Sequence, residues 1–223
     1  MKRTFLYAIM VVISLSLTGC GGGGDGSSAP QYTTQILSDP VYDGDIAQDP
    51  DTGSFSITQG MTPSVQSVFA GKEPVSLVEY RAFLDFPLSG VGGVPLNAVI
   101  VSATLDIVIN NIFLPAQANT IPIRIELVSF QPPTLVETDF SRTLQPALAF
   151  TTIAPPISQA DVGNHVFVDV TSLMIEAQRL ELPDFQVRIL EDLGIVFPGL
   201  VEINDTTGGL RGALAPLLEV TYY

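Results

Sequence analysis

Residues 98–110 read Ala-Val-Ile-Val-Ser-Ala-Thr-Leu-Asp-Ile-Val-Ile-Asn, and this stretch decides the fold class. Every odd position from Val99 to Ile109 is apolar, whereas the even positions include Thr104 and Asp106. An apolar residue at every second position is the pattern of a β-strand with one buried face. A helix would instead repeat its apolar residues every three or four positions, so the stretch predicts a strand.

The same period of two recurs along the chain, at residues 121–127, 166–170, 185–189 and 218–222. Glycine and proline residues separate these segments and predict turns. One short helix is expected after Thr171 or Ser172 as its N-cap, and Pro183 would end it. Many short strands, frequent turns and one connecting helix predict an all-β fold, an antiparallel jelly-roll-like β-sandwich.

Length and composition limit the domain count and the function classes. The chain has 223 residues, of which 46% are hydrophobic, which is enough for one sizeable core, and we expect residues 31–223 to form a single domain. Its formal charge of −14 argues against a nucleic-acid partner, because such proteins carry basic patches. The single Cys and single His exclude a disulfide framework and a multi-histidine metal centre.

The first twenty residues predict export and lipid attachment. Lys2 and Arg3 precede an apolar run over residues 5–17, which is typical of a secretory signal peptide. The run ends in Leu17-Thr18-Gly19-Cys20, which resembles the lipobox of bacterial lipoproteins. We therefore expect residues 1–19 to be a lipoprotein signal peptide and Cys20 to carry the lipid on its thiol. The alternatives are an ordinary signal peptide that contains a Cys, or an uncleaved membrane anchor.

Removing residues 1–19 leaves 7 Lys and Arg against 23 Asp and Glu, a formal charge of −16. Residues 20–30 then consist of the lipidated Cys20 and a Gly/Ser-rich tether, whose eight residues 21–28 are expected to reach about 16 Å. Two or three acyl chains make a stable anchor, so the membrane is the expected partner and the cell envelope the expected location. Gly21 stands where lipoproteins retained in the inner membrane usually carry Asp, which favours the outer membrane in a Gram-negative cell.

Several motifs resemble DNRLRE-type domains, which are related to carbohydrate-binding module family 96. Tyr80-Arg81-Ala82-Phe83-Leu84-Asp85-Phe86-Pro87-Leu88 is followed by the strand at residues 98–105, as in that family. Further similar motifs come in family order, at residues 135–140, 168–173 and 215–222. The resemblance implies a jelly-roll domain that binds carbohydrate, often with a structural calcium ion.

An acidic cluster near the start of the domain is the candidate metal site. It lies in a Pro- and Gly-rich segment and consists of Asp39, Asp43, Asp45, Asp49 and Asp51. Calcium takes six to eight oxygen ligands from flexible loops, so Asp43, Asp45, Asp49 and Asp51 are the expected ligands of a structural calcium. The alternative is a solvated acidic turn, since Asp is a common turn residue.

The sequence predicts no catalytic site. His165 opens a predicted strand and is expected to face solvent. No Gly-x-Ser-x-Gly elbow is present to supply a nucleophile for it. Among the aromatic residues that would stack on sugars, Tyr80 and Tyr222 fall in strand patterns that favour the core over a binding platform.

These observations predict a lipid-anchored binding module of the cell envelope that is not an enzyme and recognises a polysaccharide. The alternative is a structural or adhesive envelope protein that associates with a protein partner or with itself. That alternative depends on extra apolar segments at residues 112–115 and 194–200, which either enlarge the core or form an exposed patch.

Overall fold

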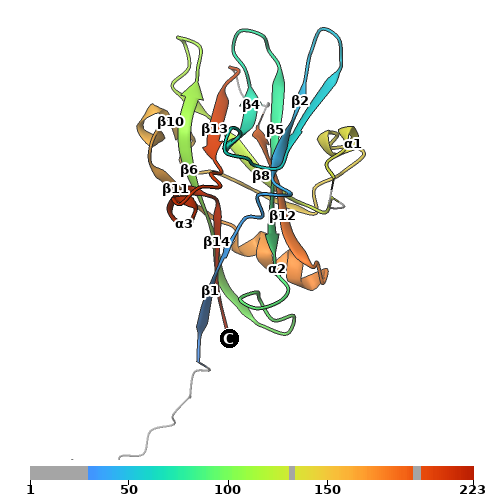
Figure 1. Cartoon of the computed structure of the whole chain (residues 1–223), viewed down its shortest axis with the longest axis vertical. Helices are drawn as coiled ribbons and strands as arrows, with labels where there is room; N and C mark the ends of the chain where they lie inside the picture. The colour runs from blue at the N-terminus through green and yellow to red at the C-terminus, as the bar shows by residue number, and fades with distance from the viewer. Residues whose placement is uncertain (1–29, 131–133, 193–196) are drawn as a thin grey trace, which may run out of the picture.

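The computed structural model describes residues 30–130, 134–192 and 197–223 (Figure 1). Its first six strands are β1 (Tyr32–Leu37), β2 (Gly44–Gln48), β3 (Phe55–Gln59), β4 (Ser67–Lys72), β5 (Glu79–Pro87) and β6 (Ile100–Phe113). The later strands are β7 (Thr120–Ile121), β8 (Ile123–Val128), β9 (Ala149–Thr152), β10 (Ile157–Ser158), β11 (His165–Asp169), β12 (Asp184–Glu191), β13 (Leu200–Asn204) and β14 (Leu217–Tyr222). The helical segments are α1 (Glu137–Phe140), the 3₁₀ turn η1 (Gln159–Asp161), α2 (Thr171–Arg179) and α3 (Arg211–Leu214).

The strands form a large curled sheet in the order β1-β14-β6-β13-β4-β5-β12-β8-β9, and each pair of neighbours is antiparallel. Strand β11 pairs with β6, and the β2–β3 hairpin pairs with β5. Side chains from both halves of the sheet meet in one apolar core, which includes Leu105, Leu218, Phe86 and Val187. This arrangement confirms an all-β, antiparallel, sandwich-like fold with a short helix.

The long strand β6 follows the predicted alternation only in its middle. Ala103, Leu105, Ile107 and Ile109 are buried, as their odd positions predict. At both ends the burial changes to even positions, because β6 contains one extra residue against β14 at 101 and one against β13 at 110. A β-bulge of this kind moves every following side chain to the other face, which is why Val99 and Val101 are exposed.

The reverse face of the sheet around β8 and β12 is also covered. A second apolar cluster packs there, made of Ile46, Phe83, Val128, Phe130, Leu135 and Phe140. Beside it, the fully buried guanidinium of Arg188 donates to the carboxylate of Glu126 at 2.7 and 2.9 Å. The same guanidinium donates to the carbonyl oxygens of Asp139 and Gln145. Arg188 therefore ties β12 to the α1 segment that covers it.

The predicted connecting helix is α2, but its cap differs from the prediction. The N-cap residue is Val170, one position before the expected Thr171. The hydroxyl of Thr171 instead accepts from the backbone N–H of Ala103 at 2.9 Å, so it joins the helix start to β6. Leu173, Met174 and Ala177 face the core as the helical spacing predicts.

The two ends of the elongated molecule differ in what they carry (Figure 1). Strand β1 and the C-terminus lie together at one end, because β1 pairs with β14. The turns of the β2–β3 and β4–β5 hairpins project from the opposite end. Of the extra apolar segments, Ile112 and Leu200 are buried, whereas Phe113 and Phe197 are partly exposed.

Candidate functional site

A groove of about 680 Å³ opens beside the β2–β3 hairpin. The hairpin supplies one set of lining residues, the β4–β13 pair supplies the other, and β5 joins them by pairing with both β2 and β4. We call this site the distal groove, since its hairpins lie at the end of the molecule opposite β1 (Figure 1). At about 680 Å³ it is larger than three other cavities of the described residues, which measure about 450, 300 and 230 Å³, and it gathers more polar side chains than each of them.

Three aromatic side chains line the distal groove: Phe55, Phe69 and Tyr80. The rings of Phe69 and Tyr80 lie 5.7 Å apart at 53°, and both are half-buried. Phe55 packs edge-on against Phe140, with 5.4 Å between the ring centroids. The prediction that Tyr80 belongs to the core is therefore wrong: Tyr80 is half-buried, is not part of the main apolar core and lines the groove, where its partners across β2 and β4 are the small residues Ala47 and Gly71.

Asp45 is the buried carboxyl group of the groove. It is 4% exposed, and its Oδ2 accepts from the backbone N–H of Phe69 at 3.2 Å. Burial raises the pKa of Asp45 from its ordinary value near 3.8 to about 7, although the N–H of Phe69 opposes the rise. The pKa of Tyr80 is also raised, by its own partial burial and by the negative charges of Asp45 and Glu73. Near neutral pH the groove thus holds a carboxyl group that changes charge.

The remaining lining is rich in hydrogen-bonding groups. Glu202 accepts from the hydroxyl of Ser67 at 2.8 Å, and Ser67 accepts from the amide of Asn110 at 3.0 Å. These bonds fix the direction of the carboxylate. The other hydroxyl and amide groups come from Ser54, Ser56, Thr58, Ser64 and Gln66. Among the described residues that line the groove there is no Lys, Arg or His, so it suits a ligand without negative charge.

The structure does not bring the four predicted calcium ligands together. Asp43 and Asp45 are buried at the start of β2, whereas Asp49 and Asp51 follow its other end. Asp49 accepts from the backbone N–H groups of Asp51 and Thr52, which lowers its pKa and closes a turn. Within the described ranges no three acidic, His or Cys side chains converge on a metal position. Calcium at this segment stays a prediction.

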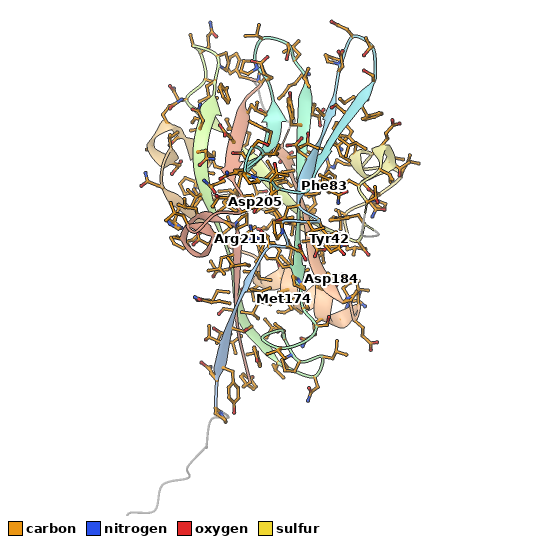
Figure 2. All side chains as sticks on the ribbon, viewed as in Figure 1. Tyr42, Phe83, Met174, Asp184, Asp205 and Arg211 are labelled. Carbon is orange, nitrogen blue, oxygen red and sulfur yellow. The ribbon has the colours of Figure 1, made fainter. Side chains whose placement is uncertain are left out.

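Asp43 meets a carboxylate that lies far away in the sequence. Asp205 follows β13, is fully buried and binds the guanidinium of Arg211 at 3.1 Å (Figure 2). Burial and the charge of Asp205 raise the pKa of Asp43 well above its ordinary range. Asp43 also accepts from the backbone N–H of Asp85 at 2.8 Å. The pair therefore connects β2, β5 and the α3 segment in the interior, away from the lining of the groove.

His165 is exposed, as predicted for a strand residue that faces solvent. Its Nδ1 lies 2.9 Å from the carboxylate of Asp106 on the neighbouring strand β6, and its ring stacks on Phe167 at 5.9 Å. Within the described part of the chain, His165 has no hydrogen bond to a hydroxyl or thiol group. The arrangement orients the imidazole but gives it no nucleophile to activate.

Cys20, with the rest of the predicted signal peptide and tether up to residue 29, lies outside the described residues. In the part of the chain that is described, no helix combines the length and the apolar character needed to cross a membrane. A comparison with protein-family models and with curated proteins finds no match for this chain.

Sequence reasoning missed Phe55, Phe69 and Glu202 as members of one site. Phe69 did leave a signal, because it lies between the apolar residues Val68 and Ala70, which a strand places together on the face opposite to Phe69. In the structure Val68 and Ala70 are fully buried, and Phe69 lines the groove. Nothing in the sequence places Phe55 or Glu202 beside it, since that contact depends on how the β2–β3 hairpin and β13 meet in space.

Proposed function

We propose that this chain is a lipid-anchored, non-catalytic binding module of the cell envelope that recognises a neutral polysaccharide in the distal groove. The observation that carries the proposal is the joint lining of the groove by aromatic rings and by hydroxyl, amide and carboxylate groups. Sugar rings present an apolar face to aromatic side chains and hydroxyl groups to polar ones. The lipid anchor comes from the Cys20 motif, and the sugar-binding class agrees with the resemblance to DNRLRE-type domains.

Binding of the mature protein to soluble oligosaccharides, measured by calorimetry, tests this function. The panel contains neutral glucans, mannans and xylans beside an acidic polyuronate. Phe69→Ala and Tyr80→Ala are each expected to weaken binding of the neutral ligand by about tenfold, or 1.4 kcal/mol. Phe167→Ala is the matched control, because Phe167 is an exposed aromatic residue outside the groove.

Two results would count against the proposal in different ways. If no neutral glycan binds, the ligand class is wrong. If a glycan binds and the two groove variants bind it as well as the wild type does, the ligand class survives but the groove is not its site. If Phe167→Ala weakens glycan binding more than the groove variants do, the binding site lies at the β11 surface instead.

One observation favours the second candidate function, a structural or adhesive envelope protein that associates with a protein partner or with itself. Strands β9 and β11 each have one pairing partner among the described strands, and each carries an exposed phenylalanine, Phe150 and Phe167. A cavity of about 450 Å³ lies between these strands and the start of α2. Unpaired strand edges can accept a strand from a partner. Self-association of the mature protein that Phe167→Arg abolishes would support this function.

A further inference from the structure

The end of the molecule that carries β1 displays a group of exposed apolar and aromatic side chains. They are Tyr32, Val91, Leu96, Val99 and Tyr223, which we call the tether end. Backbone hydrogen bonds of 2.8 and 3.2 Å join Val99 to Tyr223, and Tyr32 pairs with Tyr222 across β1 and β14. The loop that holds Val91 lies beside β1, because the hydroxyl of Thr34 donates to the carbonyl oxygen of Gly92 at 2.5 Å.

The exposure of these side chains is built into the fold. The side-chain amide of Gln178 on α2 donates to the carbonyl oxygens of Pro95, Leu96 and Ala98, at 3.1, 3.3 and 2.6 Å. Within the loop, the N–H of Val94 donates to the carbonyl of Leu88 at 2.9 Å. These hydrogen bonds hold the loop in one conformation, in which the side chains of Val91 and Leu96 face solvent. On a flexible loop, the same side chains would have no fixed orientation.

We propose that the tether end is a membrane-docking surface, which contacts the interface of the lipid leaflet that holds the anchor. The proposal rests on the lipid anchor of the proposed function and goes beyond it by assigning the surface of contact. The described residues begin at Pro30, two positions before Tyr32, and nine residues lie between Pro30 and Cys20. The ten Cα–Cα steps from Cys20 to Pro30 span at most about 35 Å when fully extended, so the leaflet lies within reach of this end.

The chemistry of the tether end fits a neutral lipid interface. Tyrosine prefers the headgroup region, where its ring is in contact with apolar groups and its hydroxyl with polar ones. Val91 and Leu96 supply short apolar side chains of the kind that enter the boundary between headgroups and acyl chains. None of the five side chains is basic, and the chain after residue 19 is strongly acidic, so anionic lipids gain nothing from this surface.

Docking at the tether end would give the molecule a fixed orientation. The hairpins that form the distal groove project from the opposite end (Figure 1). A domain that rests on its tether end therefore presents the groove away from the leaflet, toward ligands that are not part of the same membrane.

Single tryptophans can report this contact, since the natural chain contains no Trp. Val91→Trp places the probe at the tether end, and Val75→Trp is the matched control in the turn between β4 and β5 at the opposite end. Both valines are almost fully exposed, so neither change disturbs the core. The mature lipidated protein is reconstituted in vesicles of phosphatidylcholine, with and without brominated acyl chains.

The expected result is a blue-shifted emission and at least about twofold quenching by brominated lipid for Val91→Trp, with no change for Val75→Trp. Equal emission and equal quenching of the two variants would overturn the docking surface. Mass spectrometry of the Cys20 peptide and flotation with the vesicles report the anchor separately. An unmodified Cys20 without flotation would overturn the anchor and the docking surface together, whereas a lipidated protein with unquenched Val91→Trp would overturn the docking surface alone.

Discussion

Replacing Asp45 by Asn tests whether the groove contains a buried, ionisable carboxyl group. Burial raises the pKa of Asp45 from about 3.8 to about 7 in the folded protein, a difference that corresponds to about 4 kcal/mol. Because the folded state holds the proton more tightly than the unfolded state, this contribution to stability is complete below pH 4 and is lost as the pH rises to 7. Asn does not titrate, so the Asp45→Asn variant does not lose this contribution to stability as the pH rises.

The assay is urea unfolding of wild type and Asp45→Asn at pH 4 and pH 8. The two proteins are expected to have similar free energies of unfolding at pH 4, and the variant is expected to be more stable by up to about 4 kcal/mol at pH 8. Asp49→Asn is the control, because hydrogen bonds to backbone N–H groups lower the pKa of Asp49. A lowered pKa contributes stability that is already present above the ordinary range of Asp, so the difference in free energy of unfolding between Asp49→Asn and wild type is expected to be nearly the same at pH 4 and pH 8. If the difference between Asp45→Asn and wild type is the same at both pH values, the reasoning is refuted.

Three further predictions concern the interior, the backbone and the metal. Arg188→Met leaves the carboxylate of Glu126 and two carbonyl groups with fewer donors, so it is expected to cost about 3–5 kcal/mol in urea unfolding. Adding Glu126→Leu should recover most of that loss, and a double variant as unstable as the single one would contradict the ion-pair argument. Gly71→Ala is expected to cost at least about 2 kcal/mol, because the new Cβ would lie 2.1 Å from the carbonyl oxygen of Gly199 at a φ of +116°. Gly209→Ala meets no atom within 4 Å and should change stability by less than about 0.5 kcal/mol, so equal costs would refute the steric reasoning. If calcium binds the acidic segment as the sequence predicts, millimolar calcium raises the melting temperature of wild type but not of Asp49→Asn; no rise in wild type contradicts the site.

The fold class could be predicted because alternation is a local property. Ile123, Ile125 and Leu127 on β8 are all buried at their expected positions, and so are Phe185, Val187 and Ile189 on β12. The bulges of β6 could not be predicted, since an extra residue is visible only against its partner strand. Those bulges are the reason that the alternation reverses at the two ends of the strand.

The same alternation predicts the wrong environment for the polar residues of the central strands. Gln186 and Arg188 occupy the positions opposite the apolar ones on β12, which predicts that they face solvent. Both are buried: the guanidinium of Arg188 donates to the carbonyl groups of Asp139 and Gln145 in the segment at residues 134–148, and the amide of Gln186 donates to the buried carboxylate of Asp85 at 2.7 Å. A period of two assigns residues to faces, but whether a second face is covered depends on contacts between distant segments. The distal groove is of this kind too, since it joins residues from 45 to 202.

The use of the few cationic side chains argues for a neutral rather than an acidic ligand. Every arginine after residue 19 is held in an ion pair with a carboxylate, namely Arg81, Arg124, Arg142, Arg179, Arg188 and Arg211. An acidic polysaccharide would have to displace one of these carboxylates before it could form an ion pair with a guanidinium. It would also approach a surface with a large excess of negative charge. Neutral sugars meet no such barrier. Preference for the acidic polyuronate over neutral glycans would therefore contradict the charge argument even if the distal groove were the binding site.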